Sequence, residues 1–140
     1  MNLQPYLDFT TQLAYRAGCI TLGYFNTGIR PDYKADDTPV TAADRAAEEF
    51  IRGEIEKAYP THAIVGEEFG SAASKDNSSF KWFIDPIDGT KSFLRGVPLY
   101  AVLIGLEIEG VIQVGAAYYP GTDEMLCAAD DLGNFNDQIC

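Results

Sequence analysis

The order of two helical patterns followed by several strands most constrains the fold of this chain. Apolar residues recur at spacings of three and four between Tyr6 and Tyr24, which predicts an amphipathic helix. A second helical pattern begins near Thr41 and stops at Tyr59-Pro60, because a residue before proline is disfavoured in helical geometry. Helices early and strands late, without alternation between them, predict an α+β fold.

Three later strands are expected to form an antiparallel meander. Glu109-Gly110 and Pro120-Gly121 are turn signals that separate apolar segments. The expected strands are residues 99–107, 111–119 and 125–128. The sequence thus predicts two helices followed by an antiparallel sheet.

Three further segments have weaker patterns. Residues 63–65 are apolar and predict a short strand that runs into Gly66-Glu67-Glu68. Residues 70–79 are rich in Ser, Ala and Asn, and we expect them to be a flexible linker. Residues 130–140 show neither a terminal helix nor a polar tail, so we expect the chain to stop inside a domain.

The composition is that of one acidic domain with a sizeable core. The chain has 140 residues, of which 46% are hydrophobic. Its formal net charge is −11, and it has no Lys/Arg cluster, which argues against binding to a nucleic acid backbone. An acidic protein that binds a phosphate ester would need cations to bridge the two negative partners.

The cysteines and the apolar segments indicate a cytoplasmic protein. Cys19, Cys127 and Cys140 are widely spaced and form no CxxC pair, which favours reduced thiols over disulfides or a zinc site. The first residues lack a basic segment followed by an apolar one, so no signal peptide is expected. No apolar run approaches the ~18 residues of a membrane span.

The candidate site centres on the end of an apolar strand at residues 82–84. The strand is expected to stop at Asp85, because Pro86 fixes φ and lacks a backbone donor. Asp88 follows three residues later, and Gly89-Thr90 could open a helix. Two carboxylates suit Mg²⁺, and free amides at a helix N-terminus suit a phosphate. Together they predict metal-assisted phosphoryl chemistry.

Each acid in this region also has an ordinary structural interpretation. Asp85 and Asp88 could simply form a turn, and Glu67 could be a solvated loop carboxylate. Their joint occurrence at the ends of two apolar strands favours the metal interpretation. The carboxylates would then meet at neighbouring strand ends, and a divalent ion would relieve their repulsion.

Asp44 and Thr90 have both a structural and a catalytic interpretation. Thr41 and Asp44 fit a capping box at the start of the second helix. The two roles are compatible, since a first-turn acid can also hold a hydroxyl or a water. Thr90 could relay a proton between a water and Asp44, while its amide and that of Gly89 hold a phosphate oxygen. His62 is expected to satisfy a loop instead of binding a metal.

Three segments of the sequence resemble the inositol monophosphatase family of Mg²⁺-dependent phosphatases. The likeness lies in residues 39–44 (Pro-Val-Thr-Ala-Ala-Asp), 64–68 (Ile-Val-Gly-Glu-Glu) and 82–90 (Trp-Phe-Ile-Asp-Pro-Ile-Asp-Gly-Thr). They occur in the family's order and at plausible distances. No GxxxxGK[ST], GxGxxG, HExxH or GxSxG pattern competes with them.

The resemblance implies a layered α-β-α-β-α fold, often homodimeric, and a set of site residues. Glu67, Asp85 and the backbone carbonyl of Ile87 would hold a first Mg²⁺, and Asp85 and Asp88 a second. Asp44 and Thr90, with Glu67 at the same centre, would orient the attacking water. The amides of Gly89 and Thr90 would bind the phosphate. The implied reaction is hydrolysis of a small phosphate monoester by metal-activated water.

Residues 93–98 (Phe-Leu-Arg-Gly-Val-Pro) resemble the histidinol-phosphate phosphatase branch more than the inositol branch. Histidinol phosphate is therefore the expected substrate, with inositol phosphates as the alternative. The family's second half, with a Trp-Asp motif that completes the second metal site, has no counterpart here. We therefore expect residues 1–140 to be an N-terminal half with little or no turnover, or else a non-catalytic paralogue that binds metal or dimerises.

Overall fold

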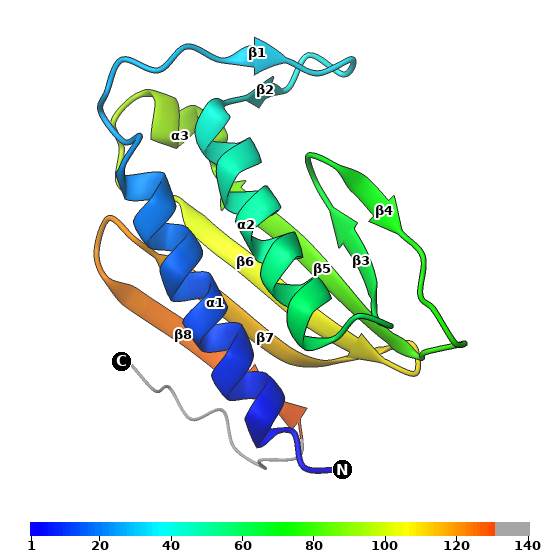
Figure 1. Ribbon diagram of the computed structural model, residues 1–140. Coiled ribbons are helices and arrows are strands. Elements are labelled where there is room, and N and C mark those ends of the chain that lie inside the picture. Colours follow the sequence, from blue (N-terminus) through cyan, green and yellow to red (C-terminus); the bar gives the residue numbers. More distant parts are fainter. Residues whose placement is uncertain (131–140) are drawn as a thin grey trace.

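A six-stranded sheet covered on one face by two long helices forms the core of the computed structural model, which describes residues 1–130 (Figure 1). The strand order in this sheet is β4-β3-β5-β6-β7-β8, and β1 and β2 form a separate pair. The elements are α1 (Gln4–Leu22), β1 (Asp32–Tyr33), β2 (Pro39–Val40), α2 (Ala42–Ala58), β3 (Ala63–Gly66), β4 (Gly70–Ala72), β5 (Phe80–Asp88), α3 (Thr90–Leu94), β6 (Ala101–Ile108), β7 (Val111–Tyr119) and β8 (Glu124–Ala129). The predicted α+β class is confirmed.

Both predicted helices are present, and each buries one face against the sheet. In α1 the buried residues include Leu13, Ala14 and Ala17, at the spacing of one helical face. A side chain at Gly18 would clash with the ring of Tyr118, so glycine lets α1 lie close to β7. The predicted pattern reached Tyr24, but α1 ends at Leu22.

A capping box opens α2, as the sequence predicts. The Thr41 hydroxyl accepts hydrogen bonds from the amides of Ala43 and Asp44, at 3.1 and 3.3 Å. In return, Oδ2 of Asp44 accepts from the Thr41 amide at 2.9 Å. These bonds satisfy donors that the first turn of a helix otherwise leaves open, and they fix where α2 begins.

The sheet is mixed, which corrects the prediction of an antiparallel one. The expected meander is present as β6, β7 and β8. However, β3 runs parallel to β5, with Ile64 opposite Trp82 and Gly66 opposite Ile84. The parallel pairing arises because the chain reverses twice between β3 and β5. First β4 runs antiparallel to β3, and then residues 73–79 lead into β5, which runs in the direction of β3.

Two local predictions around β4 and β5 are also corrected. Pro86 does not end the strand, since β5 continues to Asp88 with a shift of register against β6 between Asp85 and Asp88. A strand can contain proline at such an irregularity, because the backbone N–H that proline lacks is not needed there for pairing. Gly70–Ala72, the first part of the expected flexible linker over 70–79, pairs with β3 as β4, while the flexibility of residues 73–79 stays a prediction.

The two faces of the sheet differ in what covers them. Alternate strand residues such as Trp82, Val102 and Val114 are buried under α1 and α2. On the opposite face Phe83 and Ile112 are exposed, and α1 and α2 lie on the other side (Figure 1). The sheet therefore has one buried apolar face and one exposed apolar face.

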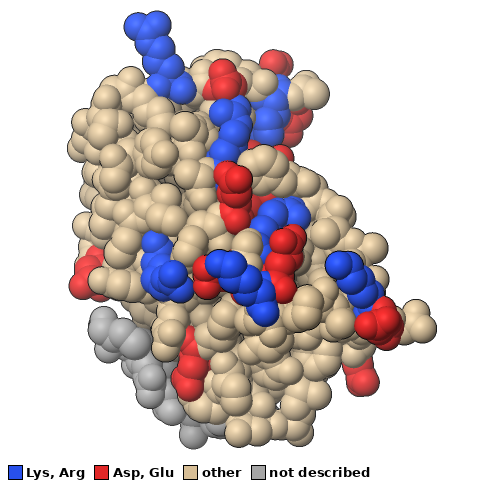
Figure 2. Space-filling model, in the orientation of Figure 1, with Lys and Arg blue, Asp and Glu red and all other residues tan. Residues whose placement is uncertain are grey.

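Charged side chains of both signs lie over the helix-covered face (Figure 2). Arg16 lies 3.5 Å from Glu54, and Arg45 lies 2.7 Å from Asp32. Within residues 1–130, none of the helices has the length and apolar character needed to cross a membrane. Cys19 and Cys127 are free thiols. Cys140 and the rest of residues 131–140, where the chain was expected to stop inside a domain, lie outside the described residues.

Candidate active site

An acidic cavity lies where β3 and β5 end and α3 begins. Its volume is about 330 Å³. Five carboxylates, including that of Asp36, line it together with two lysines and backbone of the turn after β5. The lining includes Glu67, Glu68, Asp85, Asp88, Lys34, Lys91, Ile87, Gly89 and Thr90. All the predicted metal-binding residues are thus in its wall.

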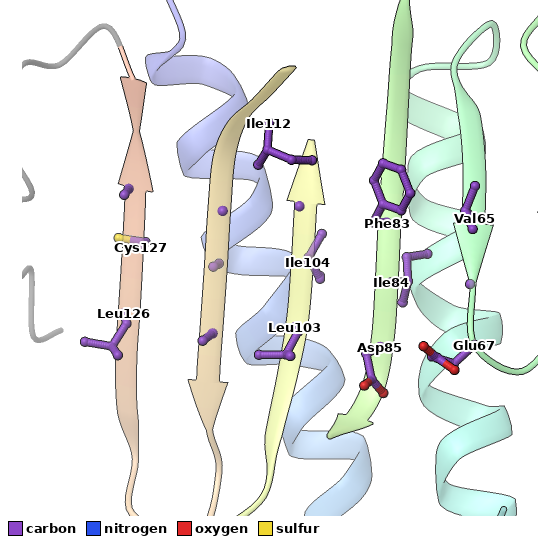
Figure 3. A pocket seen from close by; sticks show the side chains of 16 residues that line it. Val65, Glu67, Phe83, Ile84, Asp85, Leu103, Ile104, Ile112, Leu126 and Cys127 are labelled. Carbon is purple, nitrogen blue, oxygen red and sulfur yellow. The ribbon is translucent and has the colours of Figure 1, made fainter. Parts of the chain in front are cut away.

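The parallel pairing of β3 and β5 brings Glu67 beside Asp85. Carboxyl ends of parallel strands meet at the same edge, and the Glu67 amide donates to the Ile84 carbonyl at 3.2 Å. Figure 3 shows both carboxylates at the neighbouring ends of the two strands. The sequence predicted that these acids would meet at strand ends, and the backbone register places them there.

Burial and neighbouring acids raise the pKa of Asp85 to about 7. Loss of hydration is the largest cause, followed by the negative charges of Asp88 and Glu67 and then of Glu68 and Asp44. The pKa of Glu68 is also raised, mainly by burial, although Lys34 opposes the shift. The cavity therefore concentrates negative charge that a cation would stabilise.

The Thr90 hydroxyl connects this cavity to the start of α2. It donates to Oδ1 of Asp44 at 3.0 Å, and the Ile87 carbonyl is a second acceptor at 3.2 Å. Asp44 is fully buried, and its other oxygen caps α2. Gly89 precedes Thr90 with φ of 96°, a left-handed conformation that favours glycine. The turn thus places Thr90 against Asp44, while α3 itself is only five residues long.

The acids share a cavity without converging on one point. Within the described range 1–130, no group of three or more His, Cys, Asp or Glu side chains is arranged to hold a metal ion as the side chains stand. Their donor type nevertheless fits a hard divalent ion, because oxygen ligands from Glu67, Asp85 and Asp88 line one space. Binding such an ion would require these carboxylates to move toward it.

Glu48 and Lys34 are among the residues near the site that were not predicted from the sequence. Glu48 is fully buried in α2 and accepts hydrogen bonds from the amides of Glu68 and Phe69. Glu48 lies four residues after Asp44, on the same helix face. An acid at a position that the helical pattern places in the core was the signal that could have identified it. Lys34, expected on the surface, lies 3.6 Å from Glu68, whose side chain is 6% exposed.

His62 has a structural role in the core beside β5. Its ring stacks on Tyr59 and Phe80 with centroids 4.8 and 4.5 Å apart. The indole N–H of Trp82 donates to Nδ1 of His62 at 3.0 Å. His62 was expected to satisfy a loop; it lies in the loop between α2 and β3 but packs against aromatic rings and accepts from Trp82 of β5.

The fold and the cavity define a two-layer α+β protein with acids gathered at the ends of parallel strands. The model of the inositol monophosphatase family matches residues 2–139, and the chain belongs to this family. The family assignment made from the three sequence motifs is confirmed.

Similar proteins include a histidinol-phosphatase and an inositol-1-monophosphatase. A histidinol-phosphatase of Chlorobaculum parvum is 45% identical over 134 residues, which cover 95% of this chain and 51% of the relative. An inositol-1-monophosphatase of Mesorhizobium japonicum is 43% identical over 137 residues, covering 96% and 51%. The chain thus spans about half the length of the curated relatives it matches.

Solved structures share the fold. The extragenic suppressor protein suhB of Bartonella henselae superposes with a TM-score of 0.88 at 32% identity, covering 98% of this chain and 54% of that one. An inositol monophosphatase of Anabaena gives 0.78 at 38% identity, covering 95% and 47%.

Proposed function

We propose that this chain provides the metal-binding and phosphate-binding part of a Mg²⁺-dependent phosphomonoesterase. The observation that carries the proposal is the cavity that gathers Glu67, Asp85 and Asp88 beside Thr90, with Thr90 hydrogen-bonded to Asp44. The raised pKa of Asp85 supports it, because these acids repel one another where a cation would stabilise them.

The residues of the cavity would have two roles, metal binding and orientation of a water. Glu67, Asp85, Asp88 and the Ile87 carbonyl would hold Mg²⁺, which when bound polarises a phosphoryl oxygen and lowers the pKa of a water. The Thr90 hydroxyl donates to Asp44, so its oxygen can accept a hydrogen bond from a water in the cavity.

The phosphate would lie against the turn after β5. The amides of Gly89 and Thr90 would donate to a phosphate oxygen, since both residues line the cavity. A small phosphorylated metabolite is therefore the proposed ligand.

We propose histidinol phosphate as the substrate, and inositol phosphate as the second candidate. Relatives named histidinol-phosphatase are 45% and 42% identical to this chain, and residues 93–98 resemble that branch. The 43% identical inositol-1-monophosphatase supports the alternative. A cytoplasmic location and a homodimer of the whole protein remain predictions.

A metal titration tests the site directly. Mn²⁺, a stand-in for Mg²⁺, is added to the chain and the free ion is measured by electron paramagnetic resonance. We expect saturable binding that Mg²⁺ displaces and that Asp85→Asn weakens at least about tenfold. Glu56→Gln removes a charge from an exposed position of α2 and is the matched control. No binding, or equal binding by Asp85→Asn, contradicts the proposal.

A phosphate-release assay then separates the candidate functions. Histidinol phosphate and inositol 1-phosphate are compared with and without a chelator. Faster, chelator-sensitive release from histidinol phosphate supports the preferred substrate, and the reverse order supports the inositol alternative. Metal binding without any release contradicts both substrates for this chain alone and is the result expected of an N-terminal half with little or no turnover as well as of a non-catalytic metal-binding paralogue.

A further inference from the structure

Glu48 of α2 has a buried carboxylate whose two oxygens are both used. Oε1 accepts from the Glu68 amide at 2.9 Å, and Oε2 accepts from the Phe69 amide at 2.8 Å. Oε2 also lies 3.0 Å from Nε of Arg52, one turn further along α2. A carboxylate with no exposed surface is costly to bury, and these three donors offset that cost.

The turn that Glu48 holds is the one that carries Glu67. The Glu67 amide donates a hydrogen bond to the Ile84 carbonyl of β5. The amides of the next two residues, Glu68 and Phe69, donate to the Glu48 carboxylate. The segment is therefore fixed to the sheet and to α2, with Glu67 between the two attachments.

Two further contacts join the turn between β3 and β4 to α2. A Cβ on Gly66 would lie 2.5 Å from Cδ of Glu48, so only glycine leaves room for the carboxylate there. The Arg52 guanidinium donates to the Gly70 carbonyl at the start of β4. Both ends of the turn between β3 and β4 thus contact the Glu48–Arg52 ion pair.

We propose that Glu48 is a positioning residue that holds Glu67 in register with Asp85 and Asp44 for divalent-ion binding. Asp44 and Glu48 are one turn apart in α2, so one rigid helix orients both the acid that accepts from Thr90 and the turn that carries Glu67. The inference rests on the proposed function, and it adds a residue that the metal does not touch.

Glu48→Gln tests the role, and Glu49→Gln, at the adjacent exposed position, is the control for loss of charge and helix propensity. Hydrogen exchange of the Glu68 and Phe69 amides is measured without metal, and Mn²⁺ affinity is measured under conditions where each variant is fully folded. We expect Glu48→Gln to speed exchange at both amides and to weaken Mn²⁺ binding about tenfold, and Glu49→Gln to change neither.

Arg52→Gln is the second variant, which serves if Glu48→Gln does not fold. It leaves the two amide bonds to Glu48 intact, so a smaller loss of Mn²⁺ affinity, about threefold, is expected. Unchanged amide exchange or unchanged affinity in a folded Glu48→Gln overturns the inference alone. Where only Arg52→Gln folds, unchanged Mn²⁺ affinity in that variant overturns it. Absence of Mn²⁺ binding by the unsubstituted chain overturns the proposed function and with it the role toward the metal.

Discussion

Thr90 donates a hydrogen bond to Oδ1 of Asp44 across 3.0 Å, which joins the start of α3 to the start of α2. The same carboxylate caps α2 through Oδ2. Capping and contact with the site are therefore simultaneous, and the capping interpretation is confirmed. The role of Asp44 in catalysis stays a prediction.

Replacement of Thr90 by Val removes the hydroxyl while keeping the branched shape. The buried Oδ1 of Asp44 then loses its donor, and we expect the free energy of unfolding to fall by about 1–2 kcal/mol. Thr90→Ser retains the hydroxyl and is expected to stay within about 0.5 kcal/mol of the unsubstituted chain. Urea unfolding measures both, and equal stability of the two variants contradicts the prediction.

Substitutions of Asp44 separate its charge from its hydrogen bonds. Asp44→Ala leaves the Thr41 amide and hydroxyl without their acceptor, and we expect a loss of about 2–3 kcal/mol. Asp44→Asn can still accept from Thr41 and should cost about 1 kcal/mol. Chemical denaturation measures the difference. If Asp44→Ala were as stable as Asp44→Asn, the capping bonds would contribute nothing.

The stability of the fold should depend on the protonation of His62. Burial lowers its pKa below the ordinary value of 6.5, so the unfolded chain binds this proton more readily than the folded one. Stability from neutral His62 is therefore complete above pH 6.5 and is lost as pH falls through the lower, folded pKa. Protonation of Nδ1 would also remove the acceptor of the Trp82 indole N–H.

We expect the loss of stability between about pH 7.5 and about pH 5.5 to be smaller in His62→Gln than in the unsubstituted chain. Asp85 has a raised pKa and acts in the opposite direction, but both proteins contain it, so their difference reports on His62. Thermal melting at the two pH values is the measurement. An equal loss in both proteins would show that His62 does not titrate in this way.

Gly53 weakens α2 without an evident structural need. It lies inside the helix, and a Cβ there would meet no atom within 4 Å. Gly53→Ala should raise the free energy of unfolding by about 0.5–1 kcal/mol, because alanine loses less backbone freedom. The matched contrast is Gly66→Ala, which would press against Glu48 and should destabilise by about 1–3 kcal/mol. A stabilising Gly66→Ala would contradict the close packing of that turn.

The exposed sheet face should make the isolated chain prone to association. Phe83, Ile112 and Leu126 are 36%, 54% and 48% exposed, and they line a broad apolar groove of about 900 Å³ (Figure 3). Large exposed apolar patches favour association. The double variant Ile112→Thr, Leu126→Thr should reduce concentration-dependent association in analytical ultracentrifugation. Val97→Thr, in the exposed loop after α3, is the control and should have no effect.

Local patterns predicted the helices and most strands because they reflect local interactions. The 3.6-residue period identified α1 and α2, and Thr41 with Asp44 identified the start of α2. The segment 111–119 predicted β7 with its observed bounds, since turn residues flank it on both sides. The three motifs also identified four of the five acids that line the cavity, all but Asp36, and the family of the chain.

The amino-acid sequence by itself determined the two long helices, most of the strands, their order and which acids lie near strand ends. Only the tertiary structure decided that β3 runs parallel to β5, that Pro86 lies within a strand, and that Glu48 is a buried acceptor. Periodicity and capping depend on residues a few positions apart, so they can be read along the chain. The direction of strand pairing and the partners of a buried carboxylate depend on segments that meet only when the sheet and α2 pack together.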